Sequence, residues 1–193
     1  MSKSAGVMML LVVFLAGSPA WSAADDAGTV IEKARELLAD GDFTEARDIL
    51  LNESQKADST GEILFMLTLA RLGAGDLPGA KGLDEAAKLF VQAALAGYHY
   101  PVDSAWEYED IRADRYIEAN LRAAAPLLKA KDRLKKTAGI NLLWNVVAID
   151  PNAGGAAEKL GVELVKDGRT GEALKLYVRL LKLLPIPDPG LYG

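Results

Sequence analysis

Apolar residues recur at helical spacing over most of the 193-residue chain. The clearest stripe follows the i, i+3, i+4, i+7 pattern of an α-helix and consists of Ala157, Leu160, Gly161 and Leu164. The same spacing predicts further helices over 28–40, 44–52, 62–72, 83–97, 139–151 and 171–184, with a degenerate helix within 114–132. Helices therefore account for most of the predicted structure.

Turn signals divide these predicted helices into hairpins. Asp167-Gly168 ends one helix with a residue that tolerates the left-handed cap conformation, and Thr170 caps the next helix. Near the N-terminus, Gly41-Asp42 supplies a similar turn, at which Phe43 packs the corner. Because neither helix of such a pair buries its apolar stripe alone, the hairpins are expected to stack on their neighbours. The pattern predicts an all-α fold.

The clearest internal repeat lies at the C-terminal end. Pro151 and Pro185 are 34 residues apart, the period of the tetratricopeptide repeat. The residues between them follow the order and spacing of that repeat: Ala157, Leu160-Gly161, Leu164, Gly168, Ala173 and Tyr177. This segment resembles the tetratricopeptide family, as does DGDFTEARDIL over 40–50. A longer loop at 73–82, followed by AAKLFVQAALAGY, resembles the Sel1-like subgroup.

The resemblance implies a right-handed superhelix of stacked antiparallel hairpins with a concave groove that binds a protein or peptide. It covers a domain over 25–185 that is irregular at 98–138 and is followed by a proline-rich tail at 186–193. The first helix of each hairpin would line the groove. The residues expected there are Ile31, Arg35 and Leu38 in the first hairpin and Glu158, Val162, Val165 and Lys166 in the last.

Two other surfaces are candidates for partner binding. An aromatic patch contains Tyr98, Tyr100, Trp106 and Tyr108, which either form an interface or seal an irregular segment onto the helices, the interpretation we favour. The last helix has no polar cap after it. Its inner face is predicted to contain Ala173, Tyr177, Leu180 and Leu181, and its uncovered outer face Leu176, Val178 and Leu183.

The N-terminus has the layout of a secretory signal peptide over residues 1–24. Lys3 is followed by an apolar run over 5–17, a Gly-Ser-Pro break and small residues, with cleavage predicted near Ser22–Ala24. The protein is therefore expected to be periplasmic or secreted. The alternative is an uncleaved anchor, because the uncharged stretch over 4–24 is just long enough to span a bilayer.

Composition excludes several kinds of chemistry. The chain has no cysteine, which excludes disulfides and thiolate metal sites, and its single histidine, His99, excludes a metal site built from two histidines. The formal charge is −5, and becomes −6 when residues 1–22, which include Lys3, are removed. This balance predicts no nucleic-acid binding and no basic face for anionic lipid, so that membrane contact is expected only through an uncleaved leader.

Motifs for catalysis are weak. Glu107, Glu109 and Asp110 cluster beside aromatic residues, which leaves open a carboxylate-dependent hydrolase, but such a run is more typical of a solvated face. The glycine-rich stretch 73–82 lacks the pattern of a phosphate loop and is expected to be a flexible connector.

Taken together, these features predict an exported, non-catalytic adaptor that has no cofactor and no metal. It would bind one or more exported proteins, for example during assembly of a periplasmic complex. The alternative is a homo-oligomer that associates through the uncapped last helix.

Overall fold

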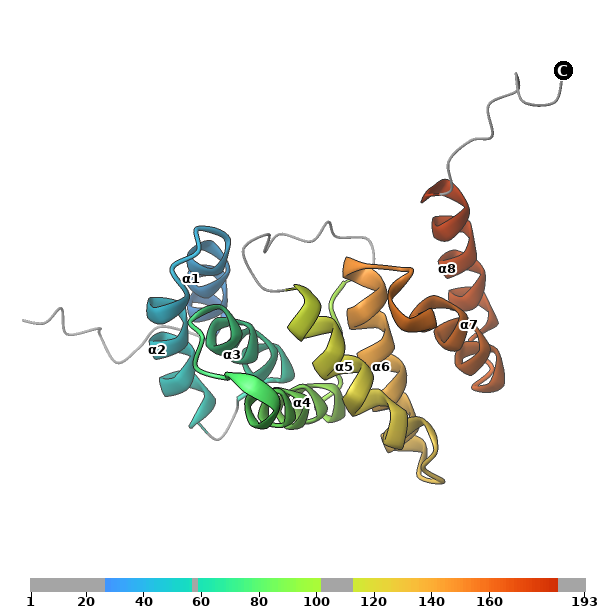
Figure 1. Ribbon diagram of the computed structural model, residues 1–193, viewed down its shortest axis with the longest axis horizontal. Helices are drawn as coiled ribbons and strands as arrows, with labels where there is room; N and C mark the ends of the chain where they lie inside the picture. Colours follow the sequence, from blue (N-terminus) through green and yellow to red (C-terminus); the bar gives the residue numbers. More distant parts are fainter. Residues whose placement is uncertain (1–26, 57–58, 102–112, 184–193) are drawn as a thin grey trace, which may run out of the picture.

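The computed structural model describes residues 27–56, 59–101 and 113–183 (Figure 1). Within these residues the chain forms eight α-helices and one short 3-10 helix, Ala153–Gly155. The α-helices are α1 (Ala27–Ala39), α2 (Phe43–Ser54), α3 (Gly61–Gly73), α4 (Gly79–Leu95), α5 (Ala113–Leu128), α6 (Arg133–Ile149), α7 (Ala156–Lys166) and α8 (Thr170–Leu183). The predicted all-α fold is confirmed. The predicted leader, residues 1–24, and the tail, 186–193, lie outside the described residues.

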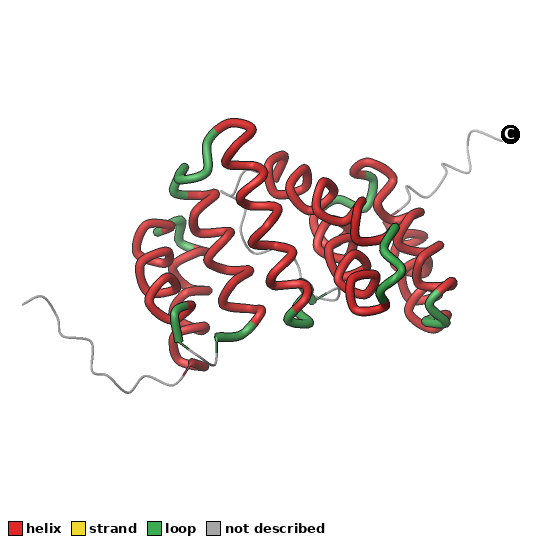
Figure 2. Tube along the Cα trace, turned by 90° about the horizontal axis from the view of Figure 1, so that it is seen from below, coloured by secondary structure: helices red, strands yellow, loops and turns green. Residues whose placement is uncertain are grey.

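The helices are arranged in the order of the chain. Each packs chiefly on the helix before it and the helix after it, and α1 also reaches α3 while α4 reaches α6. Figures 1 and 2 show the consequence: the chain progresses from α1 at one end of the molecule to α8 at the other. No helix in the described part of the chain combines the length and apolar character needed to cross a bilayer.

The turns of the first and last hairpins have the predicted glycine geometry. Gly41 and Gly168 have φ angles of 81° and 77°, the left-handed conformation that a side chain disfavours. After each glycine, the next backbone N–H returns to a carbonyl of the preceding helix, from Asp42 to Leu37 (2.8 Å) and from Arg169 to Leu164 (2.8 Å). Both hairpins therefore close in the same way.

The glycine-rich stretch 73–82 is not the flexible connector expected from its composition. Helix α4 begins within it, at Gly79, four residues before the predicted start at 83. The ring of Phe43 lies against Gly73, so closely that a Cβ there would be 2.4 Å from it. Arg115 of α5 donates from Nη2 to the carbonyl oxygens of Leu77 (2.5 Å) and Gly79 (3.0 Å). The segment is held by packing at Gly73 and by hydrogen bonds at Leu77 and Gly79.

The region expected to be irregular, 98–138, is more regular than predicted, because it contains α5 and the first turns of α6. Pro126 lies in the last turn of α5, and the helix ends two residues later at Leu128. Helix α6 then begins six residues before the predicted 139, where the side chain of Asp132 accepts a hydrogen bond from the backbone N–H of Lys135 (2.8 Å).

An aromatic cluster forms the centre of the core. The ring of Phe65 of α3 packs at a tilt against that of Tyr98, with ring centroids 4.9 Å apart, and against that of Phe90 of α4 at 5.6 Å. Tyr116 of α5 meets Phe90 edge-on at 5.2 Å. Tyr100 is only 4% exposed and also lies against Phe65. For Tyr98 and Tyr100, the geometry fits the favoured interpretation, in which the segment after α4 seals itself onto the helices; Trp106 and Tyr108 lie outside the described residues.

Candidate functional site: the C-terminal hairpin

The three groove residues expected in the first hairpin do not form a surface. Leu38 is 1% exposed and belongs to the core, because it shares with Ala34 the face of α1 that packs on the rest of the fold. The expectation that Leu38 lines a groove is therefore wrong. Ile31 is half-buried against the same core, and Arg35 is engaged in ion pairs with Glu32 (2.9 Å) and Glu62 (2.5 Å).

The four groove residues expected in the last hairpin do lie together. Glu158, Val162, Val165 and Lys166 are all exposed, and their i, i+4, i+7, i+8 spacing places them on one face of α7. Lys166 also pairs with Glu163 (2.7 Å). Binding of a partner by this face remains a prediction.

Helix α8 is rotated relative to the sequence prediction. Its buried stripe contains Ala173 and Leu176, which is 0% exposed, with Leu180 packed beside them. Tyr177 and Leu181, which were expected on the inner face, are exposed instead. The assignment of Leu176 to the outer face is therefore wrong, whereas Val178 is exposed as expected. The side chain of Leu183 is not among those described.

The exposed side of α8 carries a second apolar stripe. It follows the i, i+3, i+4, i+7 pattern and consists of Leu174, Tyr177, Val178 and Leu181. Leu174 and Leu181 are each 65% exposed. With Val162 and Val165 of α7, these four side chains form what we call the C-terminal apolar surface. It holds six of the nine large apolar side chains that are exposed in the described residues.

Tyr177 lies where α8 meets α7. Its side chain lies over Gly161 of α7, where an added Cβ would be 2.1 Å from the tyrosine hydroxyl oxygen. Gly161 is one turn before Val165 on the same helix, so the ring of Tyr177 extends the stripe of α8 towards the exposed valines. The close approach predicted at Gly161 is thus made by a side chain.

Basic residues accompany the apolar stripe. From Ala173 to Leu183, helix α8 contains Lys175, Arg179 and Lys182 and no acidic residue. Their i, i+4, i+7 spacing places them along one side of the helix. The nearest acid in the helix, Glu172, is engaged by Arg169 through hydrogen bonds of 2.7 and 2.6 Å.

The Arg169–Glu172 pair makes the stability of the last hairpin depend on pH. The hydrogen bonds from Arg169 lower the pKa of Glu172, burial opposes that shift, and the charges of Arg169, His99 and Lys175 add to it. A carboxylate with a lowered pKa stabilises the fold above its unfolded pKa, about 4.3 for glutamate, and ceases to do so as the pH falls through its folded pKa.

Glu172→Gln is accordingly expected to lower the melting temperature slightly at neutral pH. The effect should stay below about 1 kcal/mol because the pair is partly exposed. Melting curves of both proteins between pH 7 and pH values below about 4 would measure it. The difference should shrink at acidic pH; a difference that stays constant over this range would show that the charge of Glu172 has no role.

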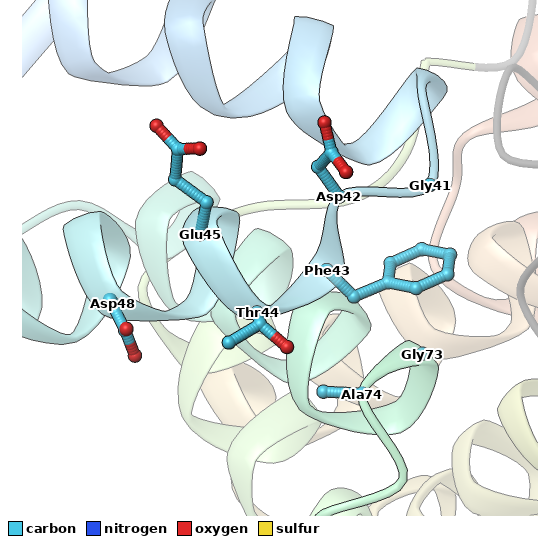
Figure 3. Close-up of a pocket in the computed structure, with 8 residues that line it drawn as sticks. All are labelled: Gly41, Asp42, Phe43, Thr44, Glu45, Asp48, Gly73 and Ala74. Atoms are coloured by element: carbon cyan, nitrogen blue, oxygen red, sulfur yellow. The ribbon is translucent and has the colours of Figure 1, made fainter.

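A hollow lies at the other end of the molecule. It measures about 530 Å³ and lies where the α1–α2 turn meets the end of α3 (Figure 3). Its lining residues include three acids, but Figure 3 shows Asp48 pointing away from the side on which Asp42 and Glu45 lie, and Asp48 is paired with Arg47 (2.8 Å). In the part of the chain that the structure describes, no three metal-ligating side chains come together. The acidic run over 107–110 lies outside that part.

Sequence reasoning overlooked a cluster of basic residues in the turn between α5 and α6 and in the first residues of α6. The cluster consists of Lys129, Lys131, Arg133, Lys135 and Lys136, all exposed, and we call it the basic tip. The expectation that the protein has no basic face, drawn from its net charge, is therefore wrong. The signal was present as KAKDRLKK over 129–136, but a net charge of −5 conceals it.

No known protein family matches this chain, and no curated protein or solved structure shows significant similarity to it. What the protein binds must therefore be inferred from its own surfaces.

Proposed function

We propose that this protein is an exported, non-catalytic adaptor built from tetratricopeptide-like hairpins, and that its last hairpin holds a helix of another exported protein. A role in the assembly or maturation of an exported complex would fit such an adaptor. The observation that carries the proposal is the C-terminal apolar surface. The leader-like residues 1–24 and the repeat pattern at 151–185 support export and the repeat architecture.

Exposed apolar side chains are ordinary when they are scattered, but a cluster of them marks an interaction site. Elsewhere in the described residues the large exposed ones are isolated, namely Leu51, Leu95 and Leu134. Tyr177 lies at the junction of α7 and α8, and tyrosine is among the residues that most often dominate binding energy at interfaces. The last hairpin therefore has the composition of a binding surface.

The form of the surface favours a helical partner. The stripe on α8 repeats at i, i+3, i+4 and i+7, the arrangement that accepts the ridge of a second helix. Along the chain each helix packs on the next, whereas α8, the last described helix, has α7 as its chief neighbour. A partner helix would occupy the position of a further element in this series.

The charges favour an acidic partner. Lys175 and Lys182 border the stripe and would face the flank of a helix packed on it. A helix with Asp or Glu on that flank would gain attraction and correct register. A second copy packed antiparallel about a two-fold axis would instead bring these cations against their equivalents, which is unfavourable.

Site-specific photo-crosslinking tests this proposal. A photoreactive residue at Val178, in the full chain expressed in its host, is expected to form an adduct with a different exported protein. Leu181→Glu should abolish the adduct because it places a charge in the stripe. Leu95→Glu, at an exposed position of α4, is the matched control and should leave the adduct intact. A photoreactive residue at Gln92, which is exposed on α4, is a second control and should give no adduct.

The identity of the crosslinked chain shows which molecule covers the C-terminal apolar surface. Mapping the crosslinked peptide should identify a helix with acidic residues beside its apolar face. Adducts of the protein with itself alone would favour the homo-oligomer over the adaptor. Adducts with residues 184–193 of the same chain would show that the tail covers the surface.

A further inference from the structure

The basic tip is a second surface with a composition unlike that of the rest of the protein. Between residues 129 and 136 it carries five cations and one carboxylate, in a chain whose net charge is −5. Figure 1 shows the α5–α6 turn projecting beyond the ends of the neighbouring helices. The tip also presents Leu134, which is 61% exposed. The concentration of cations favours a ligand with negative charge.

The cations of the tip are not neutralised locally. The single acid, Asp132, is used as the N-cap of α6, where its Oδ1 accepts from the backbone N–H of Lys135 (2.8 Å). Among the described residues, no ion pair joins any of the five cations to a carboxylate. Their charge is therefore presented to the solvent.

The position of these residues is also unfavourable for the helix. The first turn of α6 contains no acidic residue, and Arg133, Lys135 and Lys136 stand near its N-terminus. That end of a helix carries the positive pole of the macrodipole, so cations there destabilise it. A local arrangement that works against the fold is a mark of a functional surface.

We propose that the basic tip docks the protein on a membrane surface that contains anionic phospholipid. Four of its five cations are lysines, which suit a diffuse layer of headgroups and are depleted at protein–protein interfaces. Leu134, surrounded by cations, is placed to enter the boundary between headgroups and acyl chains. Nucleic acid fits less well, because residues 128–137 contain no aromatic side chain on which a base would stack.

This docking goes beyond the proposed adaptor function and is independent of it. The basic tip belongs to the α5–α6 hairpin, whereas the C-terminal apolar surface belongs to α7 and α8. A protein docked through the tip therefore keeps the last hairpin available for a partner. The two surfaces together would bring that partner to the membrane.

Vesicle sedimentation tests the docking. The chain beginning at Asp25, which retains every described helix and lacks the apolar leader, is mixed with vesicles of phosphatidylcholine alone or with added phosphatidylglycerol. It should sediment only with the anionic vesicles, and less as salt is raised. Lys131→Gln combined with Lys135→Gln should weaken partitioning by about fivefold per cation removed. Leu134→Ser should weaken it further.

The matched control is Lys81→Gln combined with Lys88→Gln, two exposed lysines of α4 whose removal changes the net charge equally. This variant should bind anionic vesicles as the parent does. Equal losses in the two double variants would overturn the proposal, since net charge would then suffice. It would also be overturned by equal binding to both kinds of vesicle, by no binding to either, or by a preference for an oligonucleotide or an acidic peptide.

Discussion

Replacing Asn145 by leucine is expected to lower the free energy of unfolding by about 3–4 kcal/mol, because two buried polar groups lose a partner. Asn145 of α6 is 1% exposed. Its Oδ1 accepts from the backbone N–H of Tyr100 (2.7 Å), and its Nδ2 donates to Oδ1 of Asn120 on α5 (3.1 Å). One amide thus joins α5, α6 and the segment that follows α4.

The rest of the network makes this loss difficult to repair. The Nδ2 of Asn120 already donates to the carbonyl oxygen of Tyr116 (2.9 Å). Asn120 therefore cannot rotate towards a new donor without breaking this hydrogen bond. Leucine has the same branched arrangement of side-chain heavy atoms as asparagine, but it is larger and offers neither a donor nor an acceptor. The increase in size is the same at another buried asparagine, so a comparison of two such substitutions isolates the polar effect.

Asn141→Leu provides the matched control, one turn earlier on the same helix. Asn141 is also buried, but its only hydrogen bond among the described residues is a long one, from Nδ2 to the carbonyl oxygen of Ala94 (3.4 Å). Its loss should cost about 1 kcal/mol. Urea unfolding of the two variants gives the comparison. A cost for Asn145→Leu no greater than that for Asn141→Leu would show that the network contributes little.

The second large effect is expected at Gly82, where alanine should destabilise the fold by about 2–3 kcal/mol. A Cβ at this position would be 2.1 Å from the carbonyl carbon of Leu77 and 2.3 Å from its oxygen. These are backbone atoms, so no side-chain rotation relieves the overlap. Arg115 donates a hydrogen bond to the same carbonyl group, which further limits any shift. Helix α4 would have to move away from the preceding turn.

Gly171→Ala tests whether this effect is specific to the site. Gly171 is also a helical glycine, in α8, and an added Cβ there would have no neighbour within 4 Å. Alanine favours the helix over glycine, so a gain of up to about 1 kcal/mol is expected. Thermal melting should therefore shift downward for Gly82→Ala and slightly upward for Gly171→Ala. Shifts in the same direction would contradict the packing proposed at Gly82.

Local signals were sufficient to predict the first and last hairpins. The turn at Gly168 could be anticipated because glycine tolerates a positive φ and an apolar stripe ended just before it. The glycines of 73–82 led to the wrong prediction of a flexible connector. A glycine that allows close approach of another group cannot be told by sequence from one that gives flexibility. The structure distinguishes them, because Phe43 lies against Gly73 and Leu77 against Gly82.

The rotation of α8 was not predictable from its pattern. The helix has apolar residues over more than half of its circumference, so both Leu176 and Tyr177 suit an inner face. Packing on α7 decides between them, because the absent side chain of Gly161 leaves room for Tyr177 at the edge while Leu176 enters the core. The basic tip was overlooked because a net charge averages over surfaces that lie far apart.

The order of the helices has a consequence for how the protein reaches its native state. Because each helix packs chiefly on its neighbours in the chain, the residues that meet are mostly close in sequence. Closing such short loops costs little entropy, and chains with local contacts fold quickly. Helices α1 and α2 pack on one another, and α3, the next helix in the chain, contacts both. The polypeptide is therefore suited to folding in stages from its N-terminus, as each new helix packs on those that precede it.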